Sequence, residues 1–125
     1  MVKEIHTVQY LLMLYLNEND WPAMTQTQRE QGYAAYAAYS EALTKANVLK
    51  GSNRLRPTSD ATTIRVSDGK PQVLDGPFAD SKEQLGGYFL IDVPDLDAAI
   101  SWASRCPAAS HGIVEVRPIW SMQAA

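Results

Sequence analysis

The chain is organised around the stretch DGPFADSKEQLGGY, residues 75–88, which lies between two strand-like runs. Gly76 and Pro77 constrain the backbone, and Phe78 is expected to anchor the loop by burial. Farther on, Gly86 and Gly87 indicate a bulge or a close backbone approach. Functional side chains are often carried on shaped polar loops, so this stretch is a candidate site.

Before the loop, the sequence predicts a tight β-hairpin. Strand-like runs at 61–66 and 72–74 flank residues 67–70. Within that turn, Asp68 and Gly69 can supply the positive φ angles that a two-residue hairpin connection requires. Pro71 begins the second strand, where a missing N–H is tolerated.

The N-terminal part predicts a strand and then a long helix. Residues 8–16 form a continuous apolar run of strand length, typical of a central strand. Residues 25–28 and 27–30 both have capping-box form ahead of an Ala-rich segment. The helix is therefore expected to run to about Ala46, with Asn47 as a left-handed terminal residue.

The inner face of this helix is expected to carry tyrosines. At 100° per residue, Tyr33, Tyr36 and Tyr39 fall on the same side as Leu43. Buried phenols need hydrogen-bond partners, which are most often backbone groups in a core. The alternative is a pocket in which Tyr36, at the centre of the stripe, orients a polar metabolite.

After the loop, the pattern predicts a strand, a helix and a strand. Residues 88–93 form the strand, Asp95 can cap the helix, and Pro107 stops it. The last strand covers residues 113–117 and directs Glu115 and Arg117 to one face. The helix is expected to bury a stripe made of Leu96, Ala99, Ile100 and Ala103.

This order of elements predicts an α+β fold of the ferredoxin-like split βαβ type with an extra hairpin. Both helices can cover the same face of the sheet. The other face then needs a cover, and the simplest cover is a second copy of the chain. We therefore expect a homodimer that encloses a space between its subunits.

Composition limits the classes of function. The 125 residues suit one domain, 1–125, with residues 1–7 expected to be a loose extension. A net charge of -3 with dispersed basic residues disfavours nucleic-acid binding. The apolar run at 10–16 is too short to cross a membrane. Cys106 is the only cysteine, expected to be buried and inert, which fits a reducing, cytoplasmic location.

The DGPF motif at 75–78 and the following KEQLGGY at 82–88 resemble the signature of the DGPF group of YCII-related proteins. Segments comparable to that family extend over roughly residues 10 to 120. The resemblance implies a dimeric α/β barrel of ferredoxin-like subunits. It also implies a gene of the kind often encoded beside alternative sigma factors of the extracytoplasmic type. The acid/base pair suggested for the shorter YCII branch is absent, because the first helix carries no His.

Candidate site residues come from the loop, the first helix and the last strand. Asp75 and His111 are the candidate catalytic residues, although a turn-forming Asp and a surface His are the alternatives. The candidate ligand-binding residues are Tyr36, Phe78, Lys82, Tyr88 and Arg117. With a single cysteine and His111 as the one histidine expected to be ordered, we expect no metal site and no cofactor.

Three functions are compatible with these residues. The first is a dimeric module that binds a small molecule or has a regulatory role. The second is a cofactor-independent lyase or isomerase that uses Asp75 as a base and His111 or a tyrosine as an acid. The third is an interaction protein associated with sigma-factor regulation. The first two predict a concave polar pocket at the dimer seam, lined by the loop at 75–82 and by Tyr36, Tyr88 and Arg117. The third predicts that side chains fill the same space.

Overall fold

A computed structural model describes residues 6–121 of the chain. Its strands are β1 (Val8–Leu16), β2 (Leu49–Arg54), β3 (Thr62–Ser67), β4 (Lys70–Asp75), β5 (Gln84–Val93) and β6 (Ile113–Pro118). Its helices are α1 (Asp20–Ala23), α2 (Gln26–Lys45) and α3 (Leu96–Arg105), with short 3₁₀ helices η1 (Thr58–Asp60) and η2 (Pro107–Ser110). Most of the expected extension, residues 1–5, lies outside the described residues.

The main sheet has four strands in the order β2-β5-β1-β6, and all of its neighbouring strands are antiparallel. Strands β3 and β4 form a separate two-stranded sheet. With α2 between β1 and β2 and α3 between β5 and β6, this topology is compatible with a ferredoxin-like α+β fold. The predicted fold class is confirmed at this level.

Strand β2 was not predicted, and the sequence interpretation is wrong in this region. Its sequence, LKGSNR, is poor in β-branched and aromatic residues, so it carries little strand signal. Pairing with β5 determines its conformation, with a register irregularity between Leu49 and Gly51. The tertiary context therefore outweighs local propensity here.

Helix α2 begins and ends as its sequence predicts. Thr25 accepts a hydrogen bond from the Gln28 backbone N–H, and the Gln28 side chain accepts from the Thr25 N–H, which completes the capping box. At the other end Asn47 has a φ of 60°, and the Val48 N–H donates to the Leu43 carbonyl at 3.1 Å. These bonds satisfy backbone groups that a helix terminus otherwise leaves unpaired.

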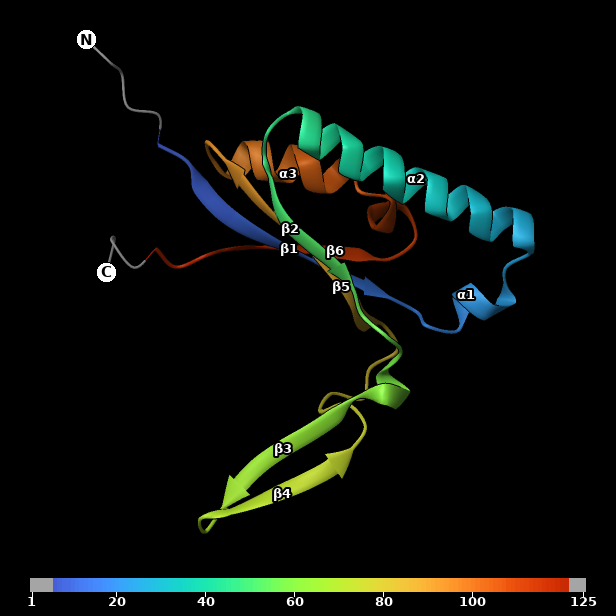
Figure 1. The fold of residues 1–125 in the computed structure, drawn as a ribbon, viewed down its shortest axis with the longest axis vertical. Helices are drawn as coiled ribbons and strands as arrows, with labels where there is room; N and C mark the ends of the chain where they lie inside the picture. Colours follow the sequence, from blue (N-terminus) through green and yellow to red (C-terminus); the bar gives the residue numbers. More distant parts are fainter. Residues whose placement is uncertain (1–5, 122–125) are drawn as a thin grey trace.

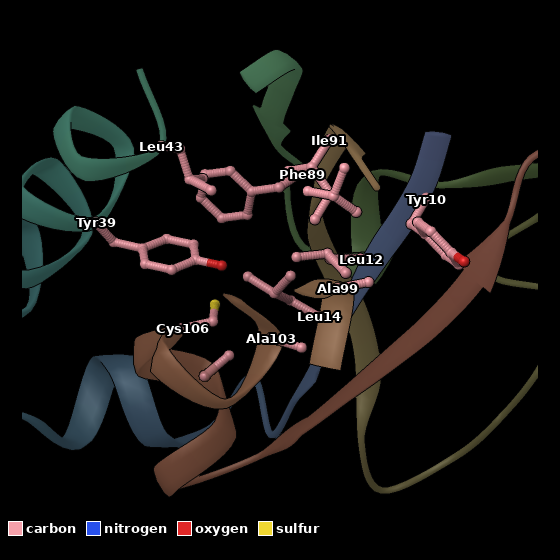
Figure 2. Close-up of a cluster of buried hydrophobic side chains, with 12 residues drawn as sticks. Tyr10, Leu12, Leu14, Tyr39, Leu43, Phe89, Ile91, Ala99, Ala103 and Cys106 are labelled. Carbon is pink, nitrogen blue, oxygen red and sulfur yellow. The ribbon is translucent and has the colours of Figure 1, made fainter. Parts of the chain in front are cut away.

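The core lies between the sheet and the two long helices, which occupy the same side of the sheet (Figure 1). Figure 2 shows Tyr39 and Leu43 of α2 directed toward the sheet, where Phe89 and Leu12 lie. The Tyr39 hydroxyl donates to the Trp102 carbonyl at 2.7 Å. The predicted burial of Cys106 is confirmed.

Two predicted buried faces are only partly buried in the chain. In α3, Ala99 and Ala103 are buried, but Leu96 and Ile100 are 49% and 47% exposed. In α2, Tyr33 is 56% exposed because it lies at the outer end of the helix, beyond the main core. The periodicity located both helices correctly but overestimated the width of their buried faces.

The second face of the main sheet carries no helix among the described residues (Figure 1). The strand register places Leu11, Met13 and Tyr15 of β1 on this face, next to Leu90 and Tyr88 of β5. We call it the open face. It is predominantly apolar at its centre.

The β3–β4 hairpin projects away from the main sheet (Figure 1). Its turn is as predicted, with φ of 52° at Asp68 and 75° at Gly69. The expected burial of Phe78 is wrong for the single chain, because this side chain is 77% exposed. In the loop that follows, the Ser81 hydroxyl donates to the Glu83 carbonyl, and β5 begins at Gln84.

Candidate functional site

A cavity of about 780 Å³ lies beneath the N-terminal half of α2. Its walls come from α1, α2, β2, η2 and the adjoining ends of β1 and β5, on the sheet face that the helices cover. We call it the α2 cavity. It is the main concave feature that the described residues form around candidate site residues.

Small residues on facing walls create this space. The lining includes Gly32 and Ala35 of α2, Ser52 of β2 and the glycines Gly86 and Gly87 of β5. Without side chains at the two β5 glycines, the floor of the cavity is bare backbone. Farther along the same helix, large side chains close the corresponding gap.

The two β5 glycines lie at a bulge and at a close backbone approach, the two features that the sequence indicated. Leu14 pairs with Gly87 and Tyr15 with Leu85, which leaves Gly86 as the extra residue of a bulge. A Cβ on Gly87 would lie 2.9 Å from the Asn53 carbonyl oxygen, closer than real Cβ contacts. The stretch 75–88 thus ends in glycines that add no side-chain volume to the cavity.

The rim of the cavity is formed by one residue from each of α1, α2 and β2, namely Trp21, Tyr33 and Arg54. The Trp21 and Tyr33 rings meet edge to face with centroids 5.0 Å apart. The Arg54 guanidinium lies 4.8 Å from the Trp21 ring centroid and 5.9 Å from that of Tyr33. Cation–π contacts at these distances hold the guanidinium in place.

Tyr36 carries a buried hydroxyl that has no hydrogen-bond partner among the described residues. Burial is the main cause that raises the pKa of Tyr36 to about 12, with a smaller lowering contribution from the Arg54 charge. The phenol is therefore protonated over the physiological range and able to donate. An unsatisfied buried donor costs free energy, and such groups usually have an explanation.

Two arginines line the cavity but differ in their pairing. Arg56 forms an ion pair with Asp60 at 2.8 Å. Within residues 6–121, no carboxylate forms an ion pair with Arg54. Glu18 also lines the cavity, but its two carboxylate oxygens accept from the Thr58 N–H and hydroxyl at 2.7 and 2.8 Å. Glu18 thus ties the chain after β1 to η1.

His111 and Ser110 contribute to the η2 side of the cavity. The Ser110 Oγ lies 3.3 Å from His111 Nδ1, and it also donates to the Pro107 carbonyl at 2.9 Å. The serine proton is directed to that carbonyl, so these two residues do not form an activated nucleophile as they stand. His111 is an exposed polar group on the cavity wall.

The candidate site residues fall into two groups. Tyr36 and His111 line the α2 cavity. Tyr88 also borders it, but the strand register directs its side chain to the open face, where its hydroxyl accepts from the Asn53 side chain at 2.7 Å. Asp75, Phe78, Lys82 and Arg117 do not line it. Asp75 ends β4 and is exposed, and Lys82 is exposed in the loop that follows. Arg117 pairs with Glu115 at 2.8 Å, on the same strand face as predicted.

Sequence reasoning missed Trp21, Arg54 and the cavity itself. Trp21 lies in a four-residue helix, too short for a periodic signal, and Arg54 lies at the end of the unpredicted strand β2. The Gly86-Gly87 pair opposite an Ala-rich helix was the available signal for a gap. No group of three or more metal-ligating side chains is clustered within residues 6–121.

Comparison with known proteins places the chain among others of similar sequence. The family described as "YCII-related domain" matches residues 8–123. An uncharacterised protein of Rhizobium meliloti (strain 1021) is 38% identical over 112 residues, which cover 88% of this chain and 90% of that protein. Among the helices of the described part of the chain, none is long and apolar enough to span a bilayer.

Proposed function

The chain belongs to the YCII-related family, and from this premise we propose that it is a homodimeric small-molecule-binding module of the DGPF group. The proposal treats residues 1–125 as one domain. The observation that carries the proposal is the α2 cavity.

The size and lining of the α2 cavity support ligand binding. Its volume of about 780 Å³ lies within the range of roughly 300–1,000 Å³ typical of small-molecule sites. Aromatic and aliphatic side chains such as Trp21, Leu14 and Phe89 supply apolar surface, and a few polar groups stand among them. This combination favours binding over a purely structural role.

The open face of the sheet and the hairpin support the dimer. Ile64 pairs with Val73 across the hairpin, and Val66 lies beside them on the same face, each more than half exposed. A two-stranded hairpin is marginally stable in water without packing partners. A second copy that stacks on the open face would shield both apolar surfaces.

We assign the remaining candidate residues, Asp75, Phe78, Lys82 and Arg117, to the proposed dimer interface. Arg117 lies on the open face beside Leu11, and the other three lie at the base of the hairpin. The lyase or isomerase alternative receives no support from the single chain, because His111 lines the α2 cavity and Asp75 does not.

Fluorescence of the uncharged probe N-phenyl-1-naphthylamine tests the binding proposal. The probe should bind wild-type protein, and Ala35→Phe and Ser52→Phe, which fill the cavity from opposite walls, should weaken that binding. Ala34→Phe is the matched control, because Ala34 is exposed on the same helix outside the cavity lining. Equal binding to all four proteins would overturn the proposal.

Light scattering coupled to size-exclusion chromatography tests the dimer. Wild-type protein should elute with twice the mass of the 13.8 kDa chain. Leu90→Glu places a charge at the centre of the open face and should give a monomer, while Ala38→Glu on the exposed side of α2 should not. A monomeric wild-type protein would contradict this part of the proposal.

A further inference from the structure

The charge of Arg54 is the starting point for the chemical class of the ligand. The α2 cavity contains one carboxylate, Glu18, and its oxygens are occupied by Thr58. Arg56 has Asp60 as its counter-ion. Arg54 therefore contributes a positive charge at the rim that no ion pair among the described residues compensates.

The Arg54 guanidinium is held in position before any ligand arrives. It lies over the Trp21 ring and near the Tyr33 ring, and these two rings contact each other. A guanidinium stacked by its face on an aromatic ring keeps its N–H edge free to donate. Preorganisation of this kind lowers the entropic cost of binding an anionic group.

Tyr36 also lines the α2 cavity, but its hydroxyl is not a donor that a ligand can reach in this structure. That oxygen is buried and has no hydrogen-bond partner within residues 6–121. The acidic group of a ligand is therefore assigned to Arg54 alone.

The rest of the cavity suits a flat apolar body. Its floor at Gly86 and Gly87 is backbone without side chains, and Phe89 and Trp21 provide aromatic surface. Planar rings pack well against peptide planes and aromatic faces.

We propose that the α2 cavity binds an anionic aromatic small molecule, with its acidic group at Arg54 and its ring over the β5 glycines. This inference rests on the proposed binding function and adds the class of the ligand. A carboxylate, sulfonate or phosphate would accept hydrogen bonds from the guanidinium.

Two dyes of similar shape test the proposed class of ligand. 8-Anilinonaphthalene-1-sulfonate carries a sulfonate, whereas N-phenyl-1-naphthylamine has the same rings without the charge. Arg54→Gln should weaken binding of the anionic dye by about tenfold or more, as expected for a lost charged hydrogen bond. The same change should alter binding of the neutral dye by less than about twofold, since only the charged contact is removed.

Matched variants separate this site from other apolar surfaces. Lys45→Gln removes the same formal charge from a paired residue outside the cavity lining, so it should leave anionic-dye binding within about twofold. Ile64→Thr on the exposed hairpin should leave binding of both dyes at the cavity unchanged.

The outcomes distinguish the two proposals. If Ala35→Phe blocks both dyes but Arg54→Gln affects them equally or not at all, the ligand class is wrong and the binding function stands. If Ala35→Phe leaves the binding of both dyes unchanged, the cavity is not a binding site and both proposals fail. A selective loss of anionic-dye binding in Arg54→Gln supports both proposals.

Discussion

The two halves of α2 cover the same face of the sheet, yet one half closes a core and the other covers a cavity. In the C-terminal half, Tyr39 and Leu43 pack against Phe89 and Ile91 of β5. In the N-terminal half, Gly32 and Ala35 line the α2 cavity together with Gly86 and Gly87 of the same strand. One helix and one strand thus build both regions.

This difference shows that side-chain volume on facing elements, rather than the backbone path, decides where a cavity forms. Tyr36 and Tyr39 illustrate it within one turn of the helix. The Tyr39 hydroxyl donates to a carbonyl in the closed core, whereas the Tyr36 hydroxyl has no partner within residues 6–121. The predictions below test whether the two halves differ in solution as they do here.

The largest effect is expected from truncation in the closed half. Leu43 is fully buried, so Leu43→Ala should lower the free energy of unfolding by about 2–5 kcal/mol through lost burial and a new void. Tyr33→Ala in the open half should cost less than about 1.5 kcal/mol, mainly its ring contact with Trp21. Urea denaturation measures both, and equal losses would remove the distinction between the halves.

Removal of the two tyrosine hydroxyls should act in opposite directions. Tyr39→Phe leaves the Trp102 carbonyl without its donor and should cost about 1–2 kcal/mol. Tyr36→Phe removes a buried group that has no partner within residues 6–121, so it should leave stability unchanged or raise it by up to about 1 kcal/mol. A clear loss of stability in Tyr36→Phe would show that its hydroxyl has a partner in solution.

The smallest change in stability is expected from the titration of Tyr36 at alkaline pH. The pKa of Tyr36 is about 12 in the folded chain, against an ordinary value of 10.0. Between these values the unfolded chain has lost the phenolic proton and the folded chain still holds it. The contribution to stability is therefore complete below pH 10 and falls as the pH rises toward 12.

Thermal unfolding at several pH values from 9 to about 12 measures this dependence. Tyr36→Phe should make the loss of stability with rising pH less steep. Part of the loss should remain, because burial also raises the pKa of Tyr39, which the variant retains. A decline of identical slope in the variant and the wild type would contradict the assigned burial of Tyr36.

Local signals in the sequence predicted most of the framework. The Thr25 cap, the left-handed Asn47 and the Asp68-Gly69 turn depend on interactions between residues close in sequence, and all three form as expected. The β5 glycines were also interpreted correctly as a bulge and a close approach. Such features need no knowledge of the tertiary structure.

The cavity and strand β2 could not be predicted in the same way. β2 depends on its pairing with β5, because Gly51, Ser52 and Asn53 have little strand propensity of their own. Arg54 becomes a rim residue only when β2, α1 and α2 come together. Of the candidate site residues, Tyr36 was located by helical periodicity, whereas the place of Asp75 relative to a pocket depends on the path of the hairpin.

The most direct test of the central claim is a map of amide chemical shifts by two-dimensional NMR during titration with 8-anilinonaphthalene-1-sulfonate. We expect the amides of Gly32, Gly86 and Gly87 to shift, while those of Leu43 and Ala99 in the closed core stay in place. Shifts confined to the closed core or to the β3–β4 hairpin would contradict the claim that the open half of α2 covers a ligand site.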